Sequence, residues 1–296
     1  MLNRSSYKHY FIMLLPGLVW LFFFNLLPMY GILMSFKDFN PGLGIFKSEW
    51  IGFANFEYMF QIDDSKRVFR NTIFIAVLKM IGNLIVPLVF ALMLNEVKNR
   101  LFTRTVQTIV YLPHFLSWVI VAGIMLDIFS YNGPINQLLM NFGSEPMLFF
   151  ANEKLFPWMV VLSDVWKEFG FAAIIFFAAL TSINPEMYEA AAIDGASQFK
   201  RLLSITLPSV LPVAILLGTL SLGNILNAGF DQIFNLYNPA VYSTGDIIDT
   251  WVYRAGLLDM QYGLATAVGL LKSVVGLILI SISYTLAYRF ANYRIF

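Results

Sequence analysis

The sequence predicts an all-α membrane protein with six transmembrane helices, and two observations lead to this fold class. Hydrophobic residues make up 58% of the 296 residues and charged residues only 12%, whereas an ordinary soluble domain carries about 25% charged residues. Apolar runs with the length of a helical span, about 20 residues, recur along the chain. Helices are the expected form of these runs because lipid offers no hydrogen bonds to the backbone.

The first apolar run, residues 11–35, is expected to be a retained span. It is too long for the core of a signal peptide, and no cleavage site of small residues follows it. Prolines within or near the runs are expected to bend the helices. Five further runs complete the predicted set, at about residues 71–94, 106–129, 156–182, 208–229 and 263–289.

The composition excludes several classes of function. The formal net charge of +1 gives no indication of a nucleic-acid partner, and a chain without cysteine has no disulfide, thiolate zinc site or cysteine nucleophile. His9 and His114 are the only histidines, so a histidine metal cluster is not expected. We expect His114 to be a satisfied polar group rather than a ligand.

Both chain termini are expected on the cytoplasmic side, with residues 1–10 as a cytoplasmic N-terminus and residues 11–296 as a single transmembrane domain. With this topology the cytoplasmic segments carry nine basic and four acidic residues, and the outside segments carry seven basic and eleven acidic residues. The cytoplasmic segments are also shorter, so their basic residues are denser, which agrees with the positive-inside rule.

A short amphipathic helix is predicted in the outside segment at residues 130–155. Asn132, Gly133 and Pro134 form a turn, after which apolar residues recur at the i, i+3, i+4 and i+7 positions, and Gly143 can end the helix. We expect this helix to lie flat on the outer membrane surface or against neighbouring spans.

The connector between the fourth and fifth runs, residues 184–208, has the signals of two short helices. Asn184 can cap the first helix and Pro185 suits its first position. Gly195 can end that helix in a left-handed turn, and Ser197 can cap the second. The Leu-Pro pair at the end of the connector is expected to break the chain before the fifth span. By these local features alone, an ordinary polar connector is an equally good interpretation.

The same connector resembles a known docking motif. A Glu-Ala-Ala triplet, then Gly195 after three residues and Ile-Thr-Leu-Pro after nine more, resembles the EAA loop of permeases in binding-protein-dependent ABC importers. The resemblance implies the type I ABC importer permease fold and makes residues 184–208 a coupling loop that docks on a cytoplasmic ATPase. It assigns the ATPase-coupling role to Glu189, Ala190, Ala191, Asp194 and Gly195.

Other parts of the chain resemble the sugar-type permeases, of which the maltose permease is the familiar member. One segment departs from their pattern: many of them carry Thr-x-Gly-Gly-Pro in the last outside loop, where this chain reads Asn-Leu-Tyr-Asn-Pro at residues 235–239. Together with residues 245–254, this segment resembles a subgroup that imports oligosaccharides from complex polysaccharides, including pectin. The matching stretches are residues 15–17, 52–56, 71–72, 112–113, 166–167 and 262–265.

The resemblance also implies partners and a location. The chain has no Walker-type phosphate loop, so two cytoplasmic ATPase subunits are expected to bind ATP and Mg, and this chain itself is expected to be non-catalytic and to bind no cofactor. The other expected partners are a second permease subunit that forms a heterodimer with this chain, an extracytoplasmic solute-binding protein and an oligosaccharide substrate. The expected location is the bilayer of a prokaryotic plasma membrane.

Candidates for the substrate path come from polar and aromatic residues near the outer half of the spans. Asn224, Asn227 and Asp231 are spaced by three and four residues, so they are expected to share one helix face and to bind sugar hydroxyls. Trp166, Trp251 and Tyr253 can stack on sugar rings, although an interfacial aromatic belt is the alternative interpretation.

Six charged residues fall within the predicted spans, where charges are expensive and usually face a cavity or a partner. The alternative is that they lie near span ends and reach headgroups or water, and lysines can also snorkel. These residues are Lys79, Asp127, Asp164, Lys167, Glu168 and Lys272.

Two other functions remain open from the sequence. A membrane-embedded enzyme would need a catalytic motif, and the chain has no His-Glu-x-x-His, no Gly-x-Ser-x-Gly and no cysteine. An ion- or proton-coupled secondary carrier would suit the charged residues in the spans, but it would have no use for the loop at residues 184–208.

Overall fold

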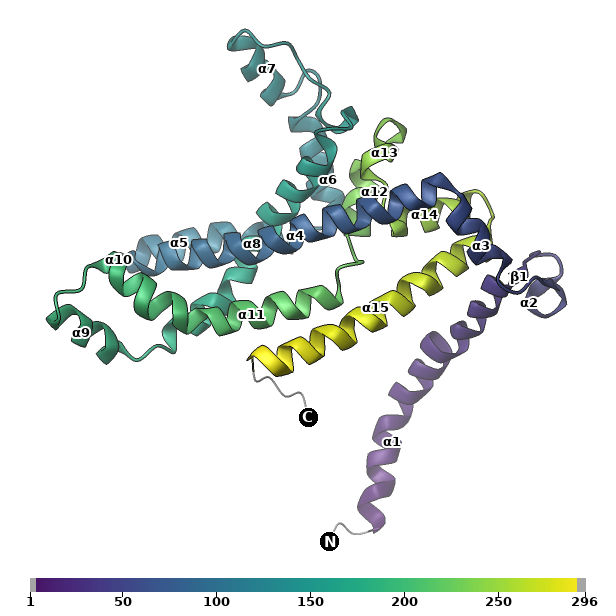
Figure 1. Cartoon of the computed structure of the whole chain (residues 1–296), viewed down its shortest axis with the longest axis horizontal. Coiled ribbons are helices and arrows are strands. Elements are labelled where there is room, and N and C mark those ends of the chain that lie inside the picture. The colour runs from purple at the N-terminus through teal and green to yellow at the C-terminus, as the bar shows by residue number, and fades with distance from the viewer. Residues whose placement is uncertain (1–3, 292–296) are drawn as a thin grey trace. The chain divides into compact units, whose positions relative to one another are not determined.

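A computed structural model describes residues 4–291 of the chain, and the fold within these residues is helical apart from one very short hairpin (Figure 1). The hairpin pairs strands β1 (Lys37–Asp38) and β2 (Glu49–Trp50) in antiparallel register. The expected all-α class is therefore confirmed, with the hairpin as a minor addition. Residues 1–3 of the expected cytoplasmic N-terminus and residues 292–296 lie outside the described part.

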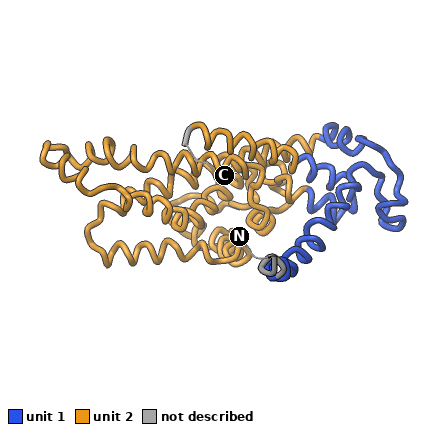
Figure 2. The backbone as a smooth tube through the Cα atoms, turned by 90° about the horizontal axis from the view of Figure 1, so that it is seen from below, with its two compact units in different colours: residues 1–62, 252–271 blue, residues 63–251, 272–296 orange. Residues whose placement is uncertain are grey.

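The chain divides into two compact units (Figure 2). The first unit, residues 1–62 and 252–271, contains a helix that continues from α1 through a π-helical segment and a 3-10 segment. The expected first span at residues 11–35 lies within this helix. The elements are α1 (Arg4–Leu21), η1 (Phe22–Leu26), η2 (Leu27–Phe36), α2 (Gly44–Lys47), α3 (Ala54–Gln61) and η7 (Arg254–Leu258).

The second unit, residues 63–251 and 272–296, contains the predicted docking loop and all the predicted substrate-path residues except Tyr253. Helix α15 begins in the first unit and ends in the second. The elements in chain order are α4 (Asp63–Asn95), α5 (Arg100–Tyr111), η3 (Leu112–Phe115), α6 (Trp118–Ile128), α7 (Pro134–Asn141), η4 (Phe149–Ala151), α8 (Phe156–Thr181), α9 (Pro185–Ile193), α10 (Gln198–Arg201), η5 (Leu202–Thr206), α11 (Leu207–Gly223), α12 (Phe230–Leu236), η6 (Pro239–Val241), α13 (Tyr242–Gly245), α14 (Ile248–Tyr253) and α15 (Tyr262–Ala291).

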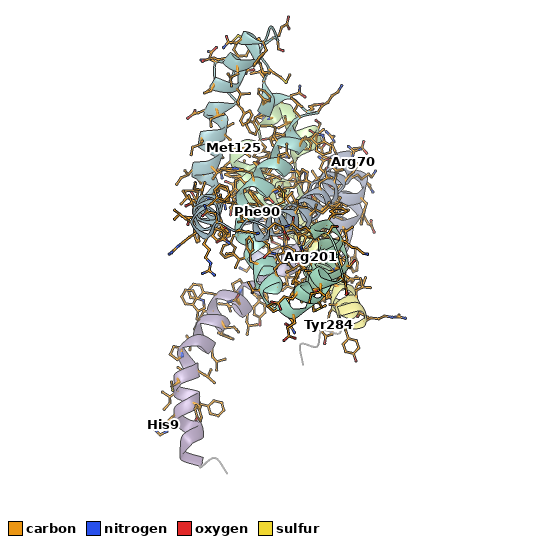
Figure 3. All side chains as sticks on the ribbon, turned by 90° about the vertical axis from the view of Figure 1, so that its left-hand side faces the viewer. His9, Arg70, Phe90, Met125, Arg201 and Tyr284 are labelled. Carbon is orange, nitrogen blue, oxygen red and sulfur yellow. The ribbon has the colours of Figure 1, made fainter. Side chains whose placement is uncertain are left out.

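The core of the second unit is a bundle in which α4, α8 and α11 lie side by side and α5 packs on α8 (Figure 1). Phe90, in the middle of the bundle (Figure 3), contacts Phe169 and Phe177 edge-on, with ring centroids 5.3 and 6.2 Å away. Helices α9 and α10 lie at one end of the bundle, and α12 and α13 lie toward the other end (Figure 1). The predicted docking loop and the segments expected on the outside are therefore at opposite ends of the same helices.

Four helices are long and apolar enough to cross a membrane, and a fifth candidate is bent. The bent pair is Arg100–Phe115 and Trp118–Ile128, whose axes differ by 102°. The expected single helix at residues 106–129 is therefore wrong. The break falls where Leu116 and Ser117 are extended and the Ser117 side chain accepts a hydrogen bond from the Ile120 N–H, which caps a new helix.

The predicted fourth span, residues 156–182, is a continuous helix, α8, with 26 residues. It differs from the other long helices because Asp164, Lys167 and Glu168 lie in its middle. Of the six expected spans, four are apolar helices, one is the bent pair and one carries these three charges.

The fifth span begins earlier and ends earlier than expected. No break occurs at Pro208, because α10, η5 and α11 form one helix over Gln198–Gly223. A π-helical turn at Leu202–Thr206 precedes the proline, and such turns rearrange the hydrogen-bond ladder that a proline would otherwise interrupt. The helix ends at Gly223, and Gly229 has a left-handed backbone with a φ of 96°.

The short amphipathic helix after Asn132 is confirmed. Helix α7 covers Pro134–Asn141, and Gly143 follows it with a φ of 82°. Helices α6 and α7 project from the bundle (Figure 1), and Phe142 at the end of α7 is 85% exposed.

Candidate docking loop and substrate path

The docking loop, residues 184–208, has the capping that its sequence predicts. The Asn184 side chain accepts a hydrogen bond from the Glu186 N–H at 3.0 Å, and Pro185 occupies the first turn of α9. The Ser197 hydroxyl accepts from the Lys200 N–H at 3.3 Å and so caps α10. Each cap satisfies a backbone donor at a helix start that would otherwise lack a partner.

Gly195 makes the sharp turn between α9 and α10. Its φ is 75°, and the N–H groups of Gly195 and Ala196 donate to the carbonyls of Ala192 and Ala191 at 3.1 and 2.9 Å. This pair of bonds is the Schellman motif, which favours glycine because a side chain at a left-handed position is strained. The turn therefore fixes the direction in which α9 projects.

Most of the predicted coupling residues face away from the bundle. Glu189, Ala190, Asp194 and Gly195 are exposed, and Ala191 is half-buried. Alanines and a glycine keep this face flat and narrow, so a partner surface can approach its backbone closely.

Two large apolar side chains on α9 were missed in the sequence interpretation. Ile193 is 87% exposed and Met187 is 48% exposed, and Phe199 on α10 is 68% exposed. Exposed apolar residues on a short polar projection are typical of a binding surface. The available signal was the presence of these residues in a connector expected to lie in the cytoplasm.

One side-chain contact holds α9 to the long helix that follows. The Tyr188 hydroxyl lies 2.9 Å from the Thr206 hydroxyl, and Thr206 is buried. This contact ties α9 to the one helix that covers Gln198–Gly223. At about 1.5 Å per residue, the 26 residues of this helix extend about 39 Å.

Five of the six charged residues in the predicted spans have an ionic partner within the protein. Lys79 on α4 is buried, and its ammonium lies 3.1 Å from Asp164 on α8. The other oxygen of Asp164 accepts from the Asn83 amide at 2.8 Å. Lys272 pairs with Asp249 at 2.6 Å. For these lysines the structure favours internal partners over snorkelling, whereas Asp127 is exposed.

A second charged cluster lies four residues further along α8. The Lys167 ammonium donates to Glu168 at 2.8 Å and to the His114 carbonyl at 3.0 Å. His114 contacts the other oxygen of Glu168 through Nδ1 at 2.6 Å and stacks on Phe171. His114 is therefore a satisfied polar group, as expected. Because Glu168 is 30% exposed, this cluster is also accessible from the surface of the chain.

The expected shared helix face of Asn224, Asn227 and Asp231 is wrong. Helix α11 ends at Gly223, residues 224–229 form a non-helical link, and Asp231 belongs to the separate helix α12. All three side chains are nevertheless exposed. A shared face requires one continuous helix, but α11 ends at Gly223 and α12 begins only after Gly229.

The aromatic candidates separate into an accessible residue and a buried one. Trp166 is 50% exposed, whereas Trp251 is 7% exposed and Tyr253 is half-buried. Trp166 and Met125 both line an apolar pocket of about 410 Å³ between α6 and α8. Asn224, Asn227 and Asp231 do not line this pocket, so the structure does not bring the amides and Trp166 together in one site.

These features define a class of protein: a helical membrane subunit with a capped, exposed short helix at one end and paired charges within its spans. Residues 83–294 match the family described as the binding-protein-dependent transport system inner membrane component. The chain belongs to this family, so it is a non-catalytic permease subunit of an ABC importer. The family decides against both the membrane-embedded enzyme and the ion-coupled carrier.

Two relatives from Bacillus subtilis (strain 168) cover nearly the whole chain. Protein LplB is 42% identical over 98% of this chain and 91% of its own length. The polygalacturonan/rhamnogalacturonan transport system permease protein YteP is 38% identical over 98% of this chain and 90% of its own length.

Two solved structures are similar in fold and sequence. One is a bacterial ABC transporter involved in the import of the acidic polysaccharide alginate, with a TM-score of 0.88 and 37% identity over 96% of each chain. The other is the alginate ABC transporter in complex with an alginate pentasaccharide-bound periplasmic protein, with a TM-score of 0.88 and 36% identity over 97% of this chain and 96% of the other. The expected type I permease fold is confirmed.

Proposed function

We propose that this chain forms half of the translocation path of an ATP-driven importer for oligosaccharides released from acidic polysaccharides. The names of the relatives carry the sugar class, because YteP is named for polygalacturonan and rhamnogalacturonan and the similar structures are of an alginate importer. The outer-loop segments at residues 235–239 and 245–254 resemble the same subgroup and so support this class from the sequence.

In this proposal the chain crosses a prokaryotic plasma membrane six times, with both termini in the cytoplasm. Helix α8 differs from the other proposed spans because three charges lie in its middle. Its 26 residues extend about 39 Å, more than the roughly 30 Å of a bilayer core. Asp164, Lys167 and Glu168 each have an ionic partner within the protein, which lowers the cost of placing them in the membrane.

The partners follow from the two ends of the second unit. At the cytoplasmic end, α9 docks on one of two ATPase subunits, which bind ATP and Mg. A second permease subunit, different from this one, completes the path, and an extracytoplasmic binding protein delivers the sugar. The pentasaccharide-bound periplasmic protein in the similar alginate structure supports that last partner.

The mechanism is alternating access driven through α9. Closure of the ATPases moves α9, and its Tyr188 contact to Thr206 and the Gly195 turn pass the movement to the helix Gln198–Gly223. The far end of that helix leads directly into the exposed Asn224 and Asn227. We assign these two residues, with Asp231 and Trp166, to the substrate path; Trp251 and Tyr253 need a rearrangement to reach a sugar.

The coupling assignment is tested by changing charge at Glu189 without altering the helix. Glu189→Lys keeps a good helix former, and we expect it to abolish uptake of trigalacturonate and co-purification of the ATPase subunits. Glu96→Lys provides the control, because it makes the same charge change at an exposed residue outside the docking loop. Unchanged uptake and ATPase binding in Glu189→Lys would overturn the assignment.

A further inference from the structure

The link between α11 and α12, residues 224–229, is held in place by one buried lysine. The Lys79 ammonium donates to the Ala228 carbonyl at 2.7 Å and to the side-chain oxygen of Gln232. Both contacts join residues that are about 150 positions apart in the sequence, at separations of 149 and 153. A helix that ends in mid-bundle leaves backbone carbonyls without helical partners, and Lys79 supplies a donor for one of the carbonyls beyond the break.

The lysine is itself fixed from the opposite side. Asp164 accepts from Lys79 at 3.1 Å, and Asn83 holds the other oxygen of Asp164 at 2.8 Å. Gln232 in turn donates from its amide to the Val160 carbonyl and to the Ser163 hydroxyl, both at 2.7 Å. The ammonium therefore connects α4, α8, the link and the first turns of α12 in one network of directional contacts.

Gly229 leaves the space that this arrangement needs. A Cβ atom at this position would lie 2.8 Å from the Lys79 nitrogen, and the φ of 96° also disfavours a side chain. The close approach of the ammonium and the left-handed backbone thus occur at the same residue, directly after the carbonyl that accepts from Lys79.

The two residues that Lys79 contacts in the link and in α12 each come directly after an exposed residue in the sequence. Ala228 and Gln232 are buried, whereas Asn227 and Asp231, each one position earlier, are exposed. Each residue bound by Lys79 therefore immediately follows a residue assigned to the substrate path. Fixing the Ala228 carbonyl and the Gln232 side chain restricts the directions that Asn227 and Asp231 can take.

We infer that Lys79 is a positioning residue for the substrate path: its ammonium, held by Asp164, sets the orientation of Asn227 and Asp231 through the Ala228 carbonyl and Gln232. This inference rests on the proposed function for its consequence, namely sugar recognition, but the orientation itself can be measured without sugar. Lys79 does not contact substrate in this account; it acts through the two residues that follow the exposed pair.

The chain contains no cysteine, so a spin label can be attached at a single introduced site. We would label Asn227→Cys in the importer assembled with cysteine-free partner subunits and record its electron paramagnetic resonance spectrum. Lys79→Met is expected to narrow the spectrum, because the link loses its donor and residue 227 gains motion. Leu162→Cys on the exposed face of α8 reports the integrity of the bundle, and its spectrum is expected to stay the same.

Two further variants distinguish a positioning role of Lys79 from an unspecific effect of breaking any ion pair. Lys79→Met with Asp164→Asn removes both charges, so it avoids an unpaired buried carboxylate, and it should still mobilise the label at 227. Lys272→Met breaks a different ion pair, with Asp249, and should leave the label at 227 unchanged. An unaltered 227 spectrum in the double variant, with the 162 spectrum intact, would overturn the inference. Failure of the wild-type importer to transport trigalacturonate would instead count against the proposed sugar class.

Discussion

The docking loop and the α11–α12 link differ in the contacts that hold their conformation: those of the loop are local, and those of the link come from distant parts of the chain. The caps and turn bonds of α9 and α10 each lie within a few residues: Asn184 with Glu186, Gly195 with Ala192, and Ser197 with Lys200. The link depends on Lys79, whose partner Ala228 is 149 positions away. A loop that projects into water is specified by its own caps, whereas a chain break inside a bundle needs donors from distant helices.

Because the link depends on a distant residue, we expect substitution of Lys79 to lower the stability of the importer more than any other change. Lys79→Met leaves Asp164, whose side chain is only 15% exposed, without its cation. Breaking a fully buried pair from one side costs about 3–5 kcal/mol, which is the upper limit here. We expect a marked fall in the melting temperature of the assembled importer. Replacing Lys79 and Asp164 together with Met and Leu should restore much of the loss. An equal fall in the single and double variants would show that the pair does not have this role.

A smaller effect is expected at Gly195, where the cost is local. A non-glycine residue at a left-handed position costs about 1–2 kcal/mol, and no atom lies within 4 Å of the Cβ position, so there is no clash to add. Gly195→Val should weaken ATPase co-purification and uptake. Gly195→Asn is the matched control, because asparagine tolerates this conformation better. Equal defects in both variants would indicate that size, not backbone conformation, matters there.

Substitutions of Asn227 and Asp231 are expected to have a moderate effect on sugar-dependent activity. Asn227→Ala or Asp231→Ala removes hydrogen bonds worth about 0.5–1.5 kcal/mol each, which corresponds to about a 2- to 12-fold loss. We expect that loss in sugar-stimulated ATP hydrolysis, with assembly intact. Wild-type stimulation in both variants would remove them from the substrate path.

The smallest effect is expected for Tyr188→Phe. It removes only the contact with Thr206, a bond worth about 1 kcal/mol, and leaves α9 itself capped. ATP hydrolysis should continue while the sugar imported per ATP falls, because α9 is less firmly tied to the long helix. An unchanged ratio would indicate that Gly195 alone transmits the movement.

The sequence anticipated the features that depend on nearby residues and missed those that depend on distant ones. The caps of α9 and α10, the Gly195 turn and helix α7 follow from local rules. The break after Phe115 and the end of α11 at Gly223 do not, because an apolar run gives no sign of where a helix stops inside a bundle. The π-helical turn before Pro208 was also beyond reach, since proline normally signals a break.

The substrate path shows the same limit at the level of single residues. Lys79, Asp164 and Glu168 were identified as charged residues in spans, but their partners Ala228, Gln232 and His114 come from other elements. Trp251 was a reasonable stacking candidate by type, and its burial results from packing that the sequence does not display. Ile193 could be read from the sequence, but its role as an exposed apolar residue can be recognised only from the way α9 projects in the structure.

The central claim is that α9 docks on the ATPase, and a crosslink tests it most directly. Ile193→Cys and Phe142→Cys place single thiols at positions of similar exposure, 87% and 85%, on α9 and at the end of α7. In the assembled, transport-active importer, a short bifunctional thiol reagent should join residue 193 to an ATPase subunit and should not join residue 142. Absence of the 193 crosslink in a working importer, or an equal crosslink from residue 142, would contradict the account.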